Sequence, residues 1–284
     1  MKFTIKHFSE RFPDDDSCLD YMFEQAYGSM PACPKCDIVE PSYYRVRNRK
    51  CYECKDCGNQ LHPLANTIFH KSSTSLRDWF YVIYLFSVAK NGVSAKEIER
   101  HLGVTYKTAW RIAKQVRALM LQGTSPLSGI VETDETYIGG KQRGKDVSVQ
   151  DKAVVFGIVE RGGNVKVEHV RSAGARVLLP RLQTNIAPGT TVYSDQAQVY
   201  RSLHRVGYYH DSVNHSAGEY GRGIVHTNTI EGFWGQLKRS IDGTYHCVSR
   251  KYLQLYLNEF VYRYNHRTDP VFPVLIASAS RRVR

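Results

Sequence analysis

Long hydrophobic runs are missing from this sequence of 284 residues. The start, MKFTIKHFSERFPDDD, has no apolar segment of the kind found in secretory signals, and it soon becomes acidic. The longest apolar run, at residues 79–89, is well short of the ~20 residues that a membrane-spanning helix requires. We therefore expect a protein that stays in the cytoplasm, with a buried helix at residues 79–89. No internal repeat or low-complexity tract is present either.

Acidic side chains are scarce relative to basic ones, with 27 Asp and Glu against 39 Lys and Arg and a formal charge of +12. The surplus is concentrated in residues 71–120 and 201–284, whereas residues 1–30 are acidic. Two separate basic regions favour a long polyanion such as DNA as partner, because each Lys or Arg near a phosphate releases condensed counterions. The alternative is a charge that serves general solubility.

The cysteines include two closely spaced pairs, CPKC and CKDCG, with seventeen residues between them. Without an export signal, reduced thiols or metal ligands are expected rather than disulfides. The surrounding residues 31–70 have little hydrophobic periodicity, so a small module there needs a cross-link. The spacing predicts a structural zinc site whose ligands are Cys33, Cys36, Cys54 and Cys57. Reduced thiols without a metal are the alternative.

Cys51 complicates the ligand assignment, because it also lies three positions before Cys54. Gly58 favours Cys57 instead, since a glycine after the second cysteine allows the sharp turn in which amides donate to thiolate sulfur. The choice between Cys51 and Cys57 rests on that argument alone. Cys18 and Cys247 stand apart and are expected to be packed thiols.

The helical pattern of residues 75–122 indicates a helix-turn-helix. Ser94 and Glu97 form an S-x-x-E capping box, Gly103 marks the break, and Thr105 can cap the following helix. The start of that second helix is where a recognition helix meets DNA, and we expect contacts from Tyr106, Lys107, Thr108 and Arg111. An ordinary packed helix pair is the alternative, because Ala109, Ala113, Val116 and Met120 make a core face.

Downstream, the pattern changes to strands and helices and predicts a mixed α/β (α+β) domain. We expect three antiparallel strands, a helix interrupted by Pro180, a further strand, a loop or small insertion near the active site, and two closing helices. In that order, these segments are 129–139, 152–160, 165–172, 175–186, 190–195, 207–225, 228–241 and 249–266. The expected domains are an N-terminal helical segment, a zinc ribbon, a helix-turn-helix region and a catalytic domain, at residues 1–30, 31–70, 71–122 and 127–284.

Several carboxylates in this region are candidates for catalysis. Along the first strand, alternation places Glu132 and Asp134 on one face and Glu135 on the other, and periodicity does not choose between the first two. Asp195 ends another strand. Glu231 lies on a helix, with Lys238 on the same face two turns later. Converging carboxylates can hold divalent cations for phosphoryl transfer, although isolated acids of this kind are more often solvated or capping residues.

Taken together, the motifs resemble those of the DDE transposases of bacterial insertion sequences that carry a zinc ribbon, the ISXO-type group. The resemblance spans nearly the whole chain and rests on CPKC with CKDCG, NTIFHKSSTSLRDWFYVIYLF, VETDETYIGGK, VYSDQAQVY and HTNTIEGFWGQLKRSIDGTYH, in the family's order. It implies a ribonuclease H-like core with a mixed sheet. It also implies that Asp134, Asp195 and Glu231 hold two Mg²⁺ (or Mn²⁺) ions, that Lys238 matches a family lysine, and that Glu132 lies outside the metal ligands.

The implied function is that of a transposase. It would bind terminal inverted repeats, cleave the element's ends and join them to target DNA, as a homodimer or larger assembly on the DNA of the nucleoid. Asn66 stands where such proteins often have glycine, and asparagine tolerates a positive φ. Two rivals are a DNA-binding regulator without catalysis, for which the first 120 residues would suffice, and a ribonuclease H-like nuclease that cuts without joining.

Overall fold

The computed structural model describes residues 3–29, 31–36, 38, 40–139, 152–195, 198–214, 217–219 and 221–281. Gly140, Lys141, Gln196 and Ala197, which belong to two of the motifs quoted above, lie outside these residues. The chain forms two compact units, Met1–Leu119 with Thr268–Arg284, and Met120–Arg267, and each is described by itself. Within the described residues, no helix has the length and apolar character needed to cross a membrane.

The first unit is a set of helices with a small sheet. Its helices are α1 (Ile5–Arg11), α2 (Asp15–Tyr27), α3 (Leu76–Val88), α4 (Ala95–Leu102), α5 (Tyr106–Leu119) and α9 (Val271–Ala279), and its strands are β1 (Tyr43–Arg45), β2 (Tyr52–Cys54) and β3 (Gln60–Leu61). Helix α3 confirms the expected buried helix, because seven of its residues are buried. The strands pair antiparallel in the order β1-β2-β3. Two side-chain contacts link this sheet to α2, Arg45 with Asp16 at 2.6 Å and Tyr52 with Asp20.

The turn between α4 and α5 follows the expected capping chemistry. The Ser94 hydroxyl accepts a hydrogen bond from the Glu97 N–H at 3.1 Å, and Gly103 ends α4 in the left-handed conformation with φ 64°. The Thr105 hydroxyl accepts from the Thr108 N–H at 3.4 Å. The same first unit confirms the expectation for Asn66, whose φ is 60°.

Helix α9 differs from the expected organisation, in which two helices close the chain and residues 268–284 belong to the catalytic domain. It lies in the first unit instead. Phe272 of α9 stacks on Phe3 with ring centroids 4.4 Å apart and meets Phe8 and Tyr84 edge-on. Burial of these rings from opposite ends of the chain holds α9 in place, and a local sequence pattern does not indicate such a distant contact.

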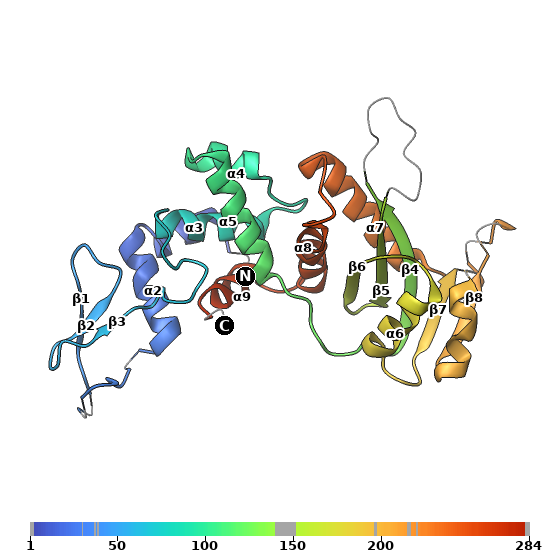
Figure 1. Ribbon diagram of the computed structural model, residues 1–284, viewed down its shortest axis with the longest axis horizontal. Helices are drawn as coiled ribbons and strands as arrows, with labels where there is room; N and C mark the ends of the chain where they lie inside the picture. The colour runs from blue at the N-terminus through green and yellow to red at the C-terminus, as the bar shows by residue number, and fades with distance from the viewer. Residues whose placement is uncertain are drawn as a thin grey trace. The chain divides into compact units, whose positions relative to one another are not determined.

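The second unit is built on a five-stranded mixed sheet in the order β6-β5-β4-β7-β8 (Figure 1). Its strands are β4 (Ile130–Ile138), β5 (Ala153–Glu160), β6 (Val165–Val170), β7 (Thr191–Asp195) and β8 (Tyr209–Val213). The first three are antiparallel neighbours, as expected, and β7 and β8 then add parallel to β4. This mixed sheet, flanked by helices, confirms the expected mixed α/β domain.

Helices cover both faces of this sheet. One face packs against α7 (Asn228–Ser240) and α8 (Leu253–Asn265), with Val155, Val159, Val165, Phe233 and Leu257 in the shared core. The other packs against α6 (Ala175–Asn185) and the 3₁₀ helix η2 (Gln198–Val206), through residues such as Val131, Ile158, Leu178, Val192 and Leu203. Each face buries apolar side chains, so the strands are positioned rigidly and can hold polar groups at their ends.

The expected helix at residues 175–186 is confirmed as α6, which continues through Pro180 because burial of Val177, Leu178 and Leu182 compensates for the hydrogen bond that proline cannot donate. One expectation for the second unit needs correction. Residues 207–225 are not only a loop, since they contain strand β8. Val213 is the one buried residue of β8, so the segment has no alternation of apolar and polar residues that would predict a strand. The strand forms because the segment pairs with β7.

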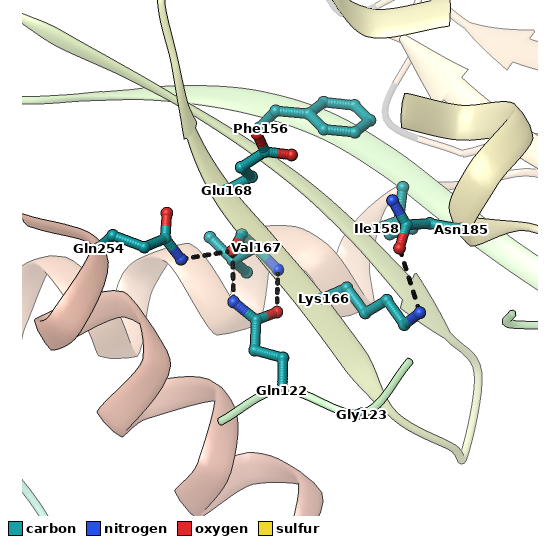
Figure 2. A pocket seen from close by; sticks show the side chains of 9 residues that line it. All are labelled: Gln122, Gly123, Phe156, Ile158, Lys166, Val167, Glu168, Asn185 and Gln254. Carbon is teal, nitrogen blue, oxygen red and sulfur yellow. Dashed lines mark hydrogen bonds between the residues drawn. The ribbon is translucent and has the colours of Figure 1, made fainter. Parts of the chain in front are cut away.

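The outer edge of the sheet is closed by side chains at β6. Carboxamide groups both donate to and accept from the backbone groups that β6 leaves unpaired (Figure 2). Going along the strand, Asn265 pairs with Val165, Gln122 with Val167, and Gln254 with His169 and Val167. These amides satisfy an edge that would otherwise accept another strand.

Candidate active site and metal centre

The four cysteines expected to bind zinc lie together in the first unit. The Sγ atoms of Cys33, Cys36, Cys54 and Cys57 all lie within 4.8 Å of one another. Gly58 has φ 68°, the left-handed conformation on which the choice of Cys57 depended, and its N–H donates to the Cys54 carbonyl at 3.0 Å. Four sulfurs at this spacing suit the tetrahedral coordination of a zinc ion.

The remaining cysteines lie outside this cluster. Cys51 is buried but does not belong to the group of four. Cys18 is also buried, in agreement with a packed thiol, and burial raises its pKa to about 12. Cys247 is exposed, so the expectation of a packed thiol was wrong for it. It follows the five-residue π-helix η4 (Ile241–Tyr245), where the chain leaves the core after α7.

Asp134 and Asp195 lie on neighbouring parallel strands at matching positions. Strands β4 and β7 pair up to Glu132 and Tyr193, and each aspartate comes two residues later on its own strand. Both line one cleft of 580 Å³, together with Glu135, Tyr137, Ala173, Gly174, Ala175, Gln198 and Val199. The strands thus bring together two of the carboxylates singled out from the sequence.

Helix α7 reaches the Asp134 carboxylate from one face of the sheet. Trp234 donates from its indole Nε1 to Asp134 Oδ2 at 3.0 Å. The approach depends on Gly157, which pairs with Asp134 across β4 and β5, because a Cβ there would lie 2.5 Å from the Trp234 ring. Trp234 and Gly157 have no catalytic or metal-binding group that a sequence motif would indicate, and the sequence analysis did not identify either residue.

Burial and neighbouring charge both act on Asp134. Burial, together with the charges of Asp195 and Glu231, raises the pKa of this carboxyl to about 6, against the lowering effects of a backbone hydrogen bond and of the Trp234 hydrogen bond. The charges of Asp195 and Glu231 therefore both act on the Asp134 carboxyl. A carboxylate in such surroundings favours a proton or a cation beside it.

Glu135 lines the same cleft although alternation places it on the opposite face of β4. It accepts a hydrogen bond from the Tyr200 hydroxyl at 2.6 Å, and burial, with the charges of Asp134 and Asp195, raises its pKa to about 7. Pairing between β4 and β7 ends before this position, whereas β4 continues to Ile138. The cleft therefore lies beyond the end of β7 and is lined by side chains from both faces of β4. Strand alternation alone did not reveal this fourth carboxylate.

Glu231 lies in the first turn of α7, where its Oε1 accepts from the Thr227 hydroxyl at 2.6 Å. Lys238 is exposed on the same helix, two turns later. Among the residues that the structure describes, only the four cysteines bring ligand atoms within 4.8 Å of one another as a set. What links the three carboxylates is the shared cleft of Asp134 and Asp195 and the charge of Glu231 acting on Asp134.

The expected DNA-contacting residues begin α5. Tyr106 and Lys107 are exposed, and the Lys96 ammonium lies 5.0 Å from the centre of the Tyr106 ring. Arg111 makes hydrogen bonds inside the first unit, because its Nη2 donates to Ser72 Oγ at 3.4 Å and to Thr74 Oγ1 at 3.3 Å. The exposed start of α5 is therefore the part of this set most open to a phosphate.

Comparisons with known families identify both parts of the chain. Residues 126–265 match the ISXO2-like transposase domain, and residues 13–60 match the transposase zinc-ribbon domain. An uncharacterized protein in the transposable element ISH50 of Halobacterium salinarum is 29% identical over 257 residues, 81% of this chain and 84% of that protein. An uncharacterized transposase-like protein of Haemophilus influenzae is 29% identical over 102 residues, 36% of this chain and 79% of that protein.

Solved structures show only distant likeness. A pre-cleavage Mos1 transpososome has a TM-score of 0.27 and 10% identity, with 72% of this chain and 80% of that chain covered. A simian T-cell lymphotropic virus intasome has a TM-score of 0.32 and 13% identity, covering 63% and 66%. TM-scores this low do not establish a shared fold or function. The two family matches, in the same order as the zinc-ribbon cysteines and the carboxylate cleft, place the chain among the zinc-ribbon DDE transposases of insertion sequences, enzymes of DNA phosphoryl transfer.

Proposed function

We propose that this transposase binds the terminal inverted repeats of its insertion sequence, cleaves the element's ends and transfers them to target DNA. The observation that carries the proposal is the placement of Asp134 and Asp195 in one cleft, at matching positions where β4 and β7 stop pairing. Helix α7 brings Glu231 close enough for its charge to act on Asp134. The substrate implied is DNA of the nucleoid, in the cytoplasm.

Within this proposal, Asp134, Asp195 and Glu231 hold two divalent cations, Mg²⁺ or Mn²⁺. The donor set fits, because hard cations prefer carboxylate oxygens and the Asp134 carboxyl, on which the charges of Asp195 and Glu231 act, gains from a positive charge beside it. When bound, the two ions would activate the attacking oxygen and stabilise the leaving oxygen of an in-line displacement. Trp234 orients the Asp134 carboxylate, and Lys238 holds a phosphate beside the ions.

The first unit supplies recognition in this proposal. Cys33, Cys36, Cys54 and Cys57 hold one structural Zn²⁺ that fixes the ribbon. Tyr106, Lys107, Thr108 and Arg111 at the start of α5 contact the terminal repeat, mostly through phosphates that set the register. Two element ends must be joined in one reaction, so the active assembly is a homodimer or larger.

A joining reaction with purified protein tests the proposed function. With Mg²⁺, a linear DNA carrying the element's terminal repeats and a supercoiled target plasmid, we expect cleavage at the repeat ends and covalently joined products, both lost in EDTA. Binding to the repeats without cleavage would instead identify a DNA-binding regulator. Cleavage without joined products would identify a nuclease.

A further inference from the structure

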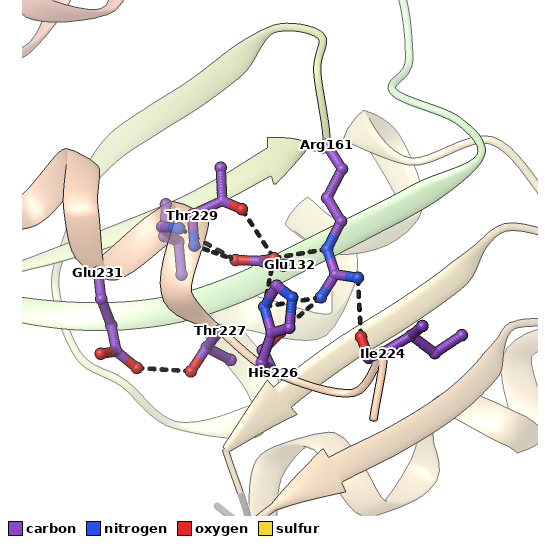
Figure 3. A network of polar contacts seen from close by, with 8 residues as sticks. Glu132, Arg161, Ile224, His226, Thr227, Thr229 and Glu231 are labelled. Carbon is purple, nitrogen blue, oxygen red and sulfur yellow. Dashed lines mark hydrogen bonds and ion pairs between the residues drawn. The ribbon is translucent and has the colours of Figure 1, made fainter. Parts of the chain in front are cut away.

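A buried carboxylate fastens the start of α7 to the sheet. Glu132 of β4 is completely buried, and it accepts hydrogen bonds from the N–H groups of Thr229 at 2.8 Å and Ile230 at 3.1 Å and from the Thr229 hydroxyl at 2.9 Å (Figure 3). The N-cap residue of α7, Thr227, makes no side-chain capping bond. Glu132 therefore supplies from a strand the negative acceptor that the first turn of a helix favours.

Arg161 balances this charge and holds the segment that precedes α7. Its Nε lies 2.7 Å from Glu132 Oε1, its Nη1 donates to the Ile224 carbonyl at 2.8 Å, and its Nη2 donates to the His226 carbonyl at 3.0 Å. The guanidinium also lies over the Tyr193 ring of β7, 4.9 Å from its centre. One side chain thus joins two strands to the approach of α7, as Figure 3 shows for most of these contacts.

The same strand carries this fastening and a proposed metal ligand. Asp134 follows Glu132 by two residues on the same face of β4, about 7 Å along the strand. Glu231 lies in the same first turn of α7 as Thr229, and the Thr227 hydroxyl holds its Oε1 at 2.6 Å. The position of this turn on β4 therefore sets how far the Glu231 carboxylate lies from Asp134.

We propose that Glu132 and Arg161 are positioning residues for Glu231, which set the geometry of the cation site without touching a cation. The inference rests on the proposed function. Outer groups that orient metal ligands typically change metal affinity or activity by about 10- to 100-fold when replaced. A purely structural role would change the stability of the fold and leave the affinity for the cation in the folded protein unaltered.

The test is the affinity of the full chain for Mn²⁺ in the variant Glu132→Gln, measured from the free Mn²⁺ signal in electron paramagnetic resonance. Glutamine keeps the shape but loses the charge, and its NH₂ group faces donors. We expect Mn²⁺ to bind about 10- to 100-fold more weakly, and DNA cleavage to require correspondingly more Mn²⁺ and to recover at saturation. Glu168→Gln is the matched control. Glu168 lies on β6 and pairs with Arg181 of α6 at 2.9 Å, so we expect no change in the affinity for Mn²⁺.

Arg161→Lys provides a second variant, because lysine keeps the charge beside Glu132 but cannot reach both carbonyl groups at once. A smaller weakening of Mn²⁺ binding is expected, and this variant decides the question if Glu132→Gln does not fold. Unaltered Mn²⁺ affinity in the folded variants would overturn the proposal. Failure of the proposed function is distinguishable, because the unaltered chain would then show no Mn²⁺-dependent cleavage of terminal repeats.

Discussion

Replacing Asp134 with asparagine is expected to abolish cleavage and joining of DNA while leaving the binding of terminal repeats intact. Asparagine preserves the shape and can still accept from Trp234, which donates at 3.0 Å in the native chain, but it removes the charge that would hold the cations. Metal ions contribute several kcal/mol to such reactions, so the rate should fall by at least about 10³-fold. Gel assays of strand cleavage and joining, with repeat binding measured in parallel, check this result.

The same variant should fold at least as stably as the native chain in EDTA. Burial and the charges of Asp195 and Glu231 raise the pKa of Asp134 to about 6. The pKa of Asp134 in the folded state lies above its unfolded value of 3.8, so ionisation of Asp134 lowers the free energy of unfolding as the pH rises from 3.8 through about 6. The uncharged asparagine side chain avoids this loss of stability. Thermal melting at pH 7 measures it. Asp211→Asn, which removes an exposed ion pair to Arg222, is the control and should keep full activity.

Replacing Cys54 with alanine is expected to release the zinc ion, unfold the ribbon and eliminate recognition of the element's ends. The Cys54 sulfur lies among four that share one site, and the small β1-β2-β3 sheet has little core of its own. Structural zinc contributes roughly 10 to 16 kcal/mol to the folding of zinc-finger peptides, far more than such a module can lose. Metal analysis and binding to a labelled terminal repeat provide the measurements.

Cys51→Ala is the matched control for the zinc prediction. Cys51 lies three positions before Cys54 in the sequence and is buried, but its sulfur does not belong to the four-cysteine cluster. The Cys51→Ala variant should therefore retain one zinc ion per chain and nearly full affinity for the repeat. If Cys54→Ala instead kept its zinc and its affinity while Cys51→Ala lost both, the ligand set proposed here would be wrong.

Local patterns in the sequence were sufficient for much of the fold. The Ser94 cap, the Gly103 break and the strands around RGGN depend on interactions within a few residues, and the structure places them as expected. The elements that were missed depend on distant partners. Strand β8 forms by pairing with β7, and α9 by packing of Phe272 on Phe3 and Phe8. Neither partner leaves a periodic signal in the segment itself.

The same division applies to the candidate site. Family motifs pointed to Asp134, Asp195 and Glu231, although spacing alone left Glu132 as an equal choice to Asp134. The structure separates those two roles, because Glu132 accepts the amides of the first turn of α7, whereas Asp134 lines the cleft. The hydrogen bonds of Trp234 to Asp134 and of Arg161 to Ile224 and His226 join residues 100, 63 and 65 positions apart in the sequence, a range that local pattern analysis does not reach.

Anomalous scattering from crystals of the chain soaked in Mn²⁺ tests the central claim most directly. The account predicts manganese peaks within coordination distance of the carboxylate oxygens of Asp134, Asp195 and Glu231, and their loss in crystals of Asp134→Asn. Manganese bound elsewhere, or bound at the cleft without Glu231, would contradict it.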